Sequence, residues 1–174
     1  MEKEITFGGG CYWCTEAMFR ELKGVISVKS GFSGGNIKNP SYKEVCTGRT
    51  GHAEVIHLVY DPELISLERL LLIHLTTHDP TTLNRQGGDV GTQYRSVIFY
   101  ANELEKAIAE KVINEVQVAY DNDIVTEIMP FEVFYEAEES HQDYYKNNTE
   151  AGYCQAVISP KLKKFREKYS DLRK

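Results

Sequence analysis

The chain has 174 residues, of which 41% are hydrophobic, with a formal net charge of −6 and a pI near 5.4. This length and apolar content fit a single domain over residues 1–174 and exclude a wholly disordered chain. The acidic balance gives no reason to expect nucleic acid or an anionic membrane as partner, and no segment has the roughly 20 apolar residues of a membrane helix.

The first part of the chain alternates strand and helix patterns. We expect a strand at residues 4–7, a helix from Cys11 to Lys23 and a strand at residues 25–32. A polar loop with glycines over residues 33–52 follows. The stretch AEVIHLVY then predicts a strand at residues 53–60, and apolar residues on both of its faces indicate a central position in the sheet.

The second part of the chain continues with similar patterns. A second long loop, over residues 79–93, separates an apolar helix from the next strand. Asn102, with Glu105 three residues later, has the pattern of a capping box. The expected elements are a helix within residues 62–78, a strand at 94–100, a helix from 102 to about 120, a strand at 128–135, and a helix from Ser159-Pro160 to Tyr169.

The order strand, helix, strand, strand, helix, strand matches a split βαβ (ferredoxin-like) plan, in which helices cover one face of a small sheet. We therefore predict an α+β, two-layer sandwich with a mixed sheet, long loops and an irregular C-terminal tail over about residues 137–174. The two long loops are places to search for site residues, because long ordered loops are often functional.

Cys11 is the strongest candidate nucleophile. It follows three glycines and begins a predicted helix, where free amides and the helix dipole would stabilise a thiolate and lower the thiol pKa. The alternative is a small buried residue at a helix start. Three consecutive glycines favour the first interpretation, since they are costly unless the backbone must approach another group closely.

The residues after Cys11 leave several interpretations open. Tyr12 and Trp13 are core aromatics, or they form an apolar wall for a methyl or thioether group. Cys11 and Cys14 form a CxxC, which suggests dithiol redox chemistry or half a zinc site. Cys46 and Cys154 form no second CxxC, which disfavours a closed zinc site. The N-terminus has no secretory pattern, so we expect a cytoplasmic protein with free or catalytic cysteines.

Glu54 lies at the start of the predicted central strand, on the same face as Ile56 and Leu58. A buried, unpaired carboxylate is costly, so its pKa would rise until it holds a proton near neutral pH, which suits a general acid. A strand-end glutamate that reaches solvent is an equal alternative.

Several segments together carry a family pattern. GGGCYWC with Glu16, TGRTGHAEV, QGGDVGTQYRSVIFY, HQDYYKN and GYC occur in this order, and the chain resembles the A-type peptide methionine sulfoxide reductases from about Phe7 to Pro160. The resemblance implies an α+β sandwich that reduces methionine S-sulfoxide, free or in oxidised proteins, in protein repair and oxidative-stress defence. It implies no metal and no nucleotide cofactor.

The resemblance also implies roles for individual residues. Cys11 would attack the sulfoxide sulfur, Glu54 would act as the acid on the oxygen, and Cys154 would resolve the resulting sulfenic acid to a disulfide that thioredoxin or another dithiol reduces. Tyr12 stands where the family usually has Phe. The substrate-binding positions implied are Tyr12, Trp13, Tyr42, Asp89 and Tyr94.

The other cysteines, the oligomeric state and the rival hypotheses complete the expectations from the sequence. Cys14 is a possible alternative resolving cysteine or a packed thiol, and Cys46 is expected to be a packed free thiol. We expect a monomer. The rival hypotheses are a general dithiol–disulfide oxidoreductase that uses Cys11 and Cys14, and a non-enzymatic metal-binding or structural module.

Overall fold

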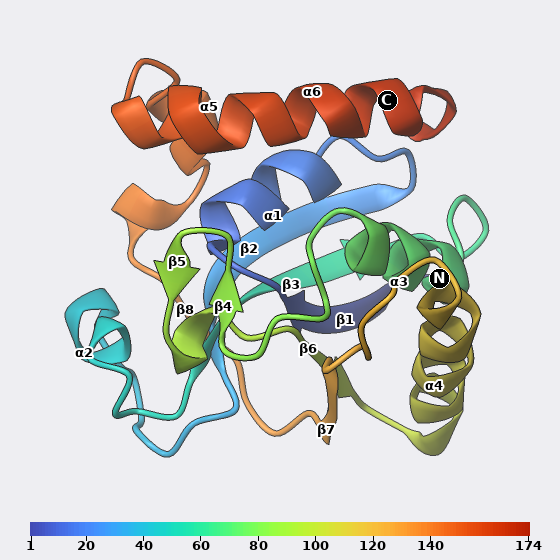
Figure 1. The fold of residues 1–174 in the computed structure, drawn as a ribbon, viewed down its shortest axis with the longest axis horizontal. Coiled ribbons are helices and arrows are strands. Elements are labelled where there is room, and N and C mark those ends of the chain that lie inside the picture. Colours follow the sequence, from blue (N-terminus) through green and yellow to red (C-terminus); the bar gives the residue numbers. More distant parts are fainter.

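A computed structural model describes residues 1–174 and contains a six-stranded sheet in the order β7-β6-β1-β3-β2-β8 (Figure 1). Neighbouring strands are antiparallel except β6 and β7, so the sheet is mixed and the predicted α+β class is confirmed. The strands are β1 Lys3–Gly8, β2 Val25–Ser33, β3 Ala53–Tyr60, β6 Val97–Tyr100, β7 Glu127–Pro130 and β8 Tyr135–Glu136.

The strand β3 lies between β1 and β2, which confirms the central position predicted from its two apolar faces. Glu54 pairs with Phe32 of β2, and Ile56 pairs with Phe7 of β1. Because side chains on one strand face alternate with period two, Glu54 and Ile56 point to the same side of the sheet.

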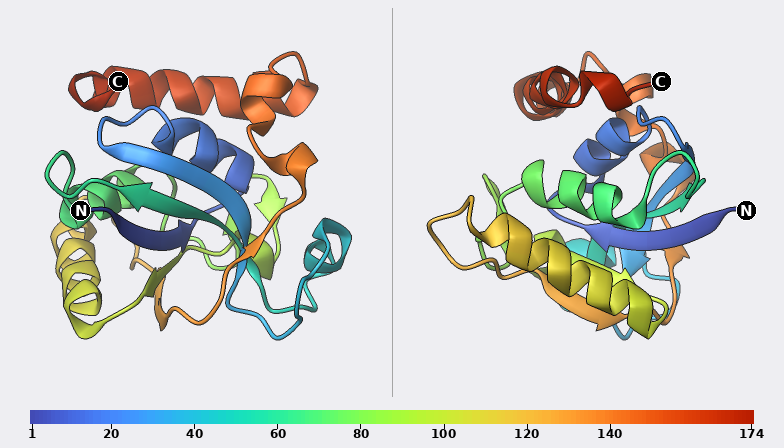
Figure 2. Two further views of the ribbon diagram at one scale, coloured as in Figure 1. Left: turned by 180° about the vertical axis from the view of Figure 1, so that it is seen from behind. Right: turned by 90° about the vertical axis from the view of Figure 1, so that its right-hand side faces the viewer.

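Three helices cover that side of the sheet, as the right-hand view of Figure 2 shows: α1 Tyr12–Phe19, α3 Leu67–Thr76 and α4 Glu103–Gln117. They enclose a core of 31 buried residues that includes Phe7, Ile56 and Leu58. The burial of this apolar surface is the main favourable contribution to folding. The helix α1 is shorter than predicted, since the chain leaves the helix at Arg20 and Lys23 donates a hydrogen bond to the carbonyl of Leu172.

The predicted strand at 128–135 is wrong as a single element. Its two ends form β7 and β8 on opposite edges of the sheet, and residues 131–134 cross between them. Phe131 and Phe134 in this crossing pack against a small cluster on the second face that contains Val55 and Phe99. The crossing residues thereby cover apolar surface on that face.

The long loops contain short elements that the sequence analysis missed. In the first loop, α2 (Tyr42–Cys46) begins with a complete capping box between Ser41 and Glu44, a readable signal in SYKE. The second contains the hairpin β4 (Arg85–Gln86) and β5 (Asp89–Val90) and a 3-10 turn, η1, at Thr92–Tyr94. The strand predicted from residue 94 therefore begins only at Val97. At the start of α4, the Asn102 side chain accepts a hydrogen bond from the Glu105 amide, as predicted. The Glu105 side chain does not complete the capping box, because it accepts the amide of Ala101 rather than that of Asn102.

The C-terminal tail is mostly helical rather than irregular. Its elements are η2 Glu139–His141, α5 Tyr144–Asn147, η3 Cys154–Ile158, α6 Ser159–Lys168 and η4 Ser170–Leu172. Ser159 does not cap the last helix as predicted. The chain is already helical in η3, a π-helical turn that contains Cys154, and the Ser159 hydroxyl pairs with that of Tyr145 at 2.7 Å. Helix α6 lies across α1 as an outer layer (Figures 1 and 2). No helix of the structure could cross a lipid bilayer.

Candidate active site

The turn between β1 and α1 brings Cys11 beside Glu54. A Cβ on Gly8 would lie 2.3 Å from the Glu54 carbonyl oxygen, so only glycine permits this approach. Gly10 has a φ of +85°, which disfavours other residues, and its amide donates to the Tyr94 carbonyl at 3.1 Å. Cys11 then stands at the N-cap of α1 with an extended backbone, φ −68° and ψ 129°.

Glu54 is buried, with a relative exposure of 1%, so the solvent-reaching alternative is wrong. Its Oε1 accepts the amide of Tyr12 at 3.2 Å, while Oε2 has no protein partner. Burial, and to a smaller extent the charge of Asp89, raise the pKa of Glu54 to about 8, although the Tyr12 amide opposes this. The carboxyl group therefore holds a proton at neutral pH and can donate it.

The Cys11 thiol does not have the lowered pKa expected of a helix start. Its pKa is raised well above the usual value, first by burial and then by the charges of Glu54 and Cys14. The Trp13 amide and the Tyr153 hydroxyl oppose this rise in the pKa but contribute less. Desolvation exceeds the helix effect because α1 is short and its first turn is buried. A protonated Glu54 removes one of the opposing charges.

Aromatic rings form one wall beside Cys11. Tyr12 lies between the rings of Phe32 and Tyr42, at centroid distances of 5.6 and 6.3 Å, and its buried hydroxyl has no protein partner. Trp13 stacks on Tyr144 at 3.7 Å, and its Nε1 donates to His141 at 3.2 Å. His141 and Tyr144 come from HQDYYKN, a segment noted in the sequence whose residues received no role there.

The two other tyrosines and the aspartate lie around the same carboxyl group. Burial and the charge of Glu54 raise the pKa of both Tyr42 and Tyr94, so their hydroxyls remain protonated donors. Tyr94 occupies the η1 turn rather than a strand end. Asp89, on β5, accepts a hydrogen bond from the Tyr153 hydroxyl at 2.7 Å. Tyr153 was not singled out from the sequence, although it directly precedes Cys154.

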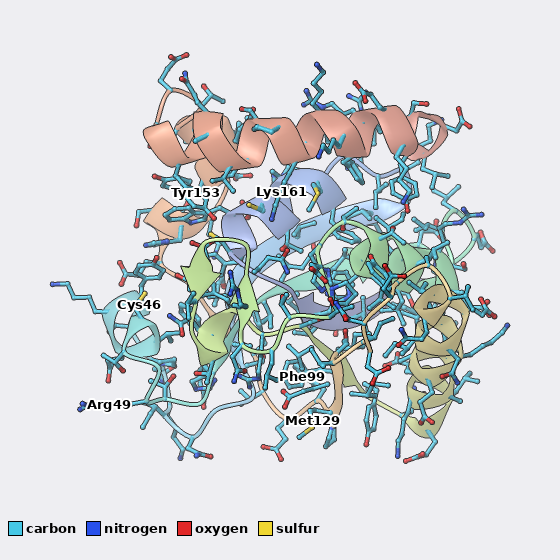
Figure 3. All side chains as sticks on the ribbon, in the orientation of Figure 1. Cys46, Arg49, Phe99, Met129, Tyr153 and Lys161 are labelled. Carbon is cyan, nitrogen blue, oxygen red and sulfur yellow. The ribbon has the colours of Figure 1, made fainter.

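All four cysteines are free thiols, and three of them are buried: Cys11, Cys14 and Cys154. The expectation that Cys46 is packed is wrong. It is exposed on α2, where it hydrogen-bonds to Tyr42, and Figure 3 shows it at the outer side of the fold. No three His, Cys, Asp or Glu side chains are arranged to hold a metal ion.

The two histidines of the apolar helix support the turn. His74 Nε2 donates to the Gly8 carbonyl at 2.9 Å, and His78 Nε2 pairs with the Ser96 hydroxyl at 2.7 Å. Burial lowers the pKa of both, to about 4 for His78, so both are neutral. They hold the end of β1 and the residue before β6 in place.

A surface cavity of about 510 Å³ lies elsewhere. Arg49, Phe99 and Met129 are among its lining residues (Figure 3), and none of the candidate site residues lines it. The rings next to Cys11 in the chain, Tyr12 and Trp13, instead offer an apolar surface, as suits a small apolar group.

A mixed α+β fold whose buried site joins reduced cysteines, a protonated carboxyl group and aromatic rings has the chemistry of a thiol-dependent oxidoreductase. The family model for peptide methionine sulfoxide reductase matches residues 3–173. Peptide methionine sulfoxide reductase MsrA of Saccharolobus solfataricus is 55% identical over 166 residues, which cover 95% of this chain and 94% of the relative. The chain therefore belongs to the peptide methionine sulfoxide reductase family, MsrA type, whose members reduce methionine sulfoxide.

Solved structures agree with this assignment. Mxr1 from Saccharomyces cerevisiae in its reduced form aligns with a TM-score of 0.82 and 38% identity, covering 88% of this chain and 89% of the yeast chain. The same yeast protein in complex with Trx2 aligns with a TM-score of 0.58 and 27% identity, covering 82% and 84%.

Replacing Glu54 by Gln tests the buried proton through stability. Between pH 4.5 and about 8, the native state keeps a proton that the unfolded chain has released, so the wild-type free energy of unfolding falls as pH rises. Glu54→Gln lacks this dependence. We therefore expect the difference in free energy of unfolding, Glu54→Gln minus wild type, to increase by a few kcal/mol as the pH rises from 4.5 to about 8. One pKa unit corresponds to about 1.4 kcal/mol.

Denaturant titrations at both ends of the window provide the measurement. Glu110→Gln, at an exposed position on α4, is the control and should follow the wild-type pH dependence. A difference between Glu54→Gln and wild type that does not vary with pH would contradict a proton held on Glu54.

Proposed function

We propose that residues 1–174 form one catalytic domain that reduces methionine S-sulfoxide, free or in oxidised proteins, with Cys11 as nucleophile and Glu54 as acid. The observation that carries this proposal is the Glu54 carboxyl group, which is buried beside Cys11 with its Oε2 unpartnered, and whose burial raises its pKa to about 8. A sulfoxide oxygen leaves poorly unless it is protonated, so a neutral carboxyl group beside a thiol is the pairing that the reaction needs.

The substrate would bind by its methyl group and its oxygen. The rings of Tyr12 and Trp13 offer an apolar surface for the methyl group, since sulfur-bearing groups pack well on aromatic rings. The sulfoxide oxygen only accepts hydrogen bonds, and the donors around it would be Glu54, Tyr42 and Tyr94. Asp89 orders the site through Tyr153.

The reaction then transfers an oxygen atom from the substrate to the enzyme. As Cys11 Sγ attacks the sulfoxide sulfur, Glu54 protonates the oxygen, and the carboxylate so formed receives the thiol proton. This attack forms a transient S–S bond between Cys11 and the substrate. The bond breaks as the hydroxyl group passes from the substrate sulfur to Cys11 Sγ, so the S–O bond of the substrate is replaced by one at Cys11, which leaves methionine and a sulfenic acid. The substrate gains two electrons and Cys11 loses two, so no metal or nucleotide is required.

Cys154 is the proposed resolving cysteine, and Cys14 is the alternative. Condensation of a thiol with the sulfenic acid releases water and forms a disulfide, which an external dithiol reduces by exchange. The yeast relative solved with Trx2 supports thioredoxin as that dithiol. Because every step starts from reduced thiols, we place the protein in a reducing compartment such as the cytoplasm, acting as a monomer.

Cys11→Ser should abolish methionine formation, because a serine hydroxyl is far less nucleophilic toward the sulfoxide sulfur. One equivalent of a peptide with methionine S-sulfoxide is incubated with reduced protein, and methionine is quantified by mass spectrometry. Cys46→Ser removes an exposed thiol outside the proposed mechanism and should retain the turnover. Residual turnover in Cys11→Ser would place the nucleophile elsewhere.

Glu54→Gln should slow the chemical step by roughly 10²–10⁴-fold, the usual contribution of a general acid, because an amide keeps a hydrogen bond but cannot release a proton. Single-turnover kinetics at saturating substrate separate this effect from binding. An unchanged rate would refute the acid role.

Cys154→Ser should leave one methionine per protein molecule and stop recycling by thioredoxin, since the first step needs only Cys11. Quantifying methionine with and without the reducing system checks both parts. Multiple turnovers with thioredoxin at the wild-type rate would show that another thiol resolves the sulfenic acid.

A further inference from the structure

The hydroxyl group of Tyr12 is buried without a hydrogen-bond partner. The side chain has a relative exposure of only 1%, and no protein group lies within hydrogen-bond distance of its oxygen. A buried tyrosine hydroxyl usually finds a partner, because leaving it unsatisfied costs free energy. A phenylalanine ring of the same shape would avoid this cost, so the oxygen atom of Tyr12 needs an explanation separate from its ring.

The surroundings of the Tyr12 ring place it beside the acid of the site. Its ring packs against Phe32 at a centroid distance of 5.6 Å. Phe32 is the cross-strand neighbour of Glu54, and directly opposed residues of antiparallel strands have their side chains on the same side of the sheet. The Tyr12 amide also donates to Glu54 Oε1 at 3.2 Å. Tyr12 is therefore next to Glu54 through both its backbone and its ring.

The charges that act on the Tyr12 hydroxyl agree with this position. Burial, and then the charges of Glu54, Tyr42 and Cys11, raise the pKa of Tyr12. The hydroxyl therefore keeps its proton at neutral pH and can donate a hydrogen bond. The three groups that act on it after burial are the proposed acid, a proposed donor to the sulfoxide oxygen and the proposed nucleophile.

Glu54 Oε2 is the second atom of the site that is buried without a partner, so this oxygen and the Tyr12 hydroxyl do not bond to each other. The hydroxyls of Tyr42 and Tyr94 are not in this state. An oxygen with two lone pairs accepts from two donors at once. An acceptor oxygen between the Tyr12 hydroxyl and the protonated Glu54 carboxyl group would therefore satisfy both groups.

We propose that the Tyr12 hydroxyl donates a hydrogen bond to the sulfoxide oxygen and so makes the site select the oxidised side chain over the reduced one. This inference rests on the proposed function, which brings a sulfoxide to Cys11. The ring of Tyr12 still packs on the methyl group, while its hydroxyl binds the oxygen. Because a thioether sulfur is only a weak acceptor, the methionine product leaves this hydroxyl unsatisfied, which favours release of the product.

Comparing an oxidised with a reduced peptide isolates the hydrogen bond to the oxygen. Isothermal titration calorimetry gives dissociation constants for a peptide with methionine S-sulfoxide and for the same peptide with methionine. The measurements use Cys11→Ser, which should not reduce the sulfoxide, with and without Tyr12→Phe. We expect Tyr12→Phe to weaken binding of the sulfoxide peptide roughly 3- to 10-fold, the usual size of one hydrogen bond, and to leave binding of the methionine peptide unchanged.

Tyr60→Phe is the matched control, because it removes the hydroxyl of another buried tyrosine, at the far end of β3. It should change neither dissociation constant. An unchanged affinity of Tyr12→Phe for the sulfoxide peptide would overturn the inference. An equal loss of affinity for both peptides would also overturn it, since that result reports on the ring and not on the oxygen. Failure of the proposed function has a different signature, because the wild-type protein would then form no methionine.

The stability of the free protein provides a second measurement. Tyr12→Phe removes an unsatisfied buried hydroxyl and keeps the ring, so we expect a higher denaturant midpoint than that of the wild type, together with the weaker binding of the sulfoxide. Denaturant titrations of the two reduced proteins provide the comparison. A midpoint equal to or below that of the wild type would show that the hydroxyl is already satisfied without substrate, and this result would overturn the inference.

Discussion

The burial of one carboxyl group beside one thiol is the constraint on which the rest of the site depends. Glu54 points to the core side of the central strand, where an ionised carboxylate is costly, so it holds its proton to about pH 8. The same burial raises the Cys11 pKa. Each group is thereby kept protonated until a substrate arrives, and the neutral state of Glu54 lowers the electrostatic barrier to a thiolate on Cys11.

This burial requires a lid, which the C-terminal segment supplies. Trp13 stacks on Tyr144 and meets the edge of the Tyr153 ring, so the tail packs directly on the first turn of α1. Tyr153 in turn hydrogen-bonds to Asp89 from the second long loop. Segments far apart in the chain thus exclude water around Cys11, and polar contacts in such an environment are stronger than in water.

Much of the fold and site could be predicted from sequence patterns. Period-two alternation located β3, and the glycine turn before Cys11 marked the start of α1. Other features depend on distant residues. The segment 128–135 reads as one strand, but its aromatic residues are needed to cover the second face of the sheet. Cys46 has the pattern of a packed residue, yet α2 turns it to solvent.

The sequence by itself determined the class of fold, the central strand and the reactive chemistry, because periodicity and residue type are local properties of the chain. It could not determine which of the groups that react are ionised. The pKa of Cys11 follows from desolvation by the whole fold, which exceeds the local effect of the helix start. Likewise, only tertiary packing brings η3, which carries Cys154, against α1, whose N-cap is Cys11. Distances between residues 140 positions apart are decided by tertiary packing alone.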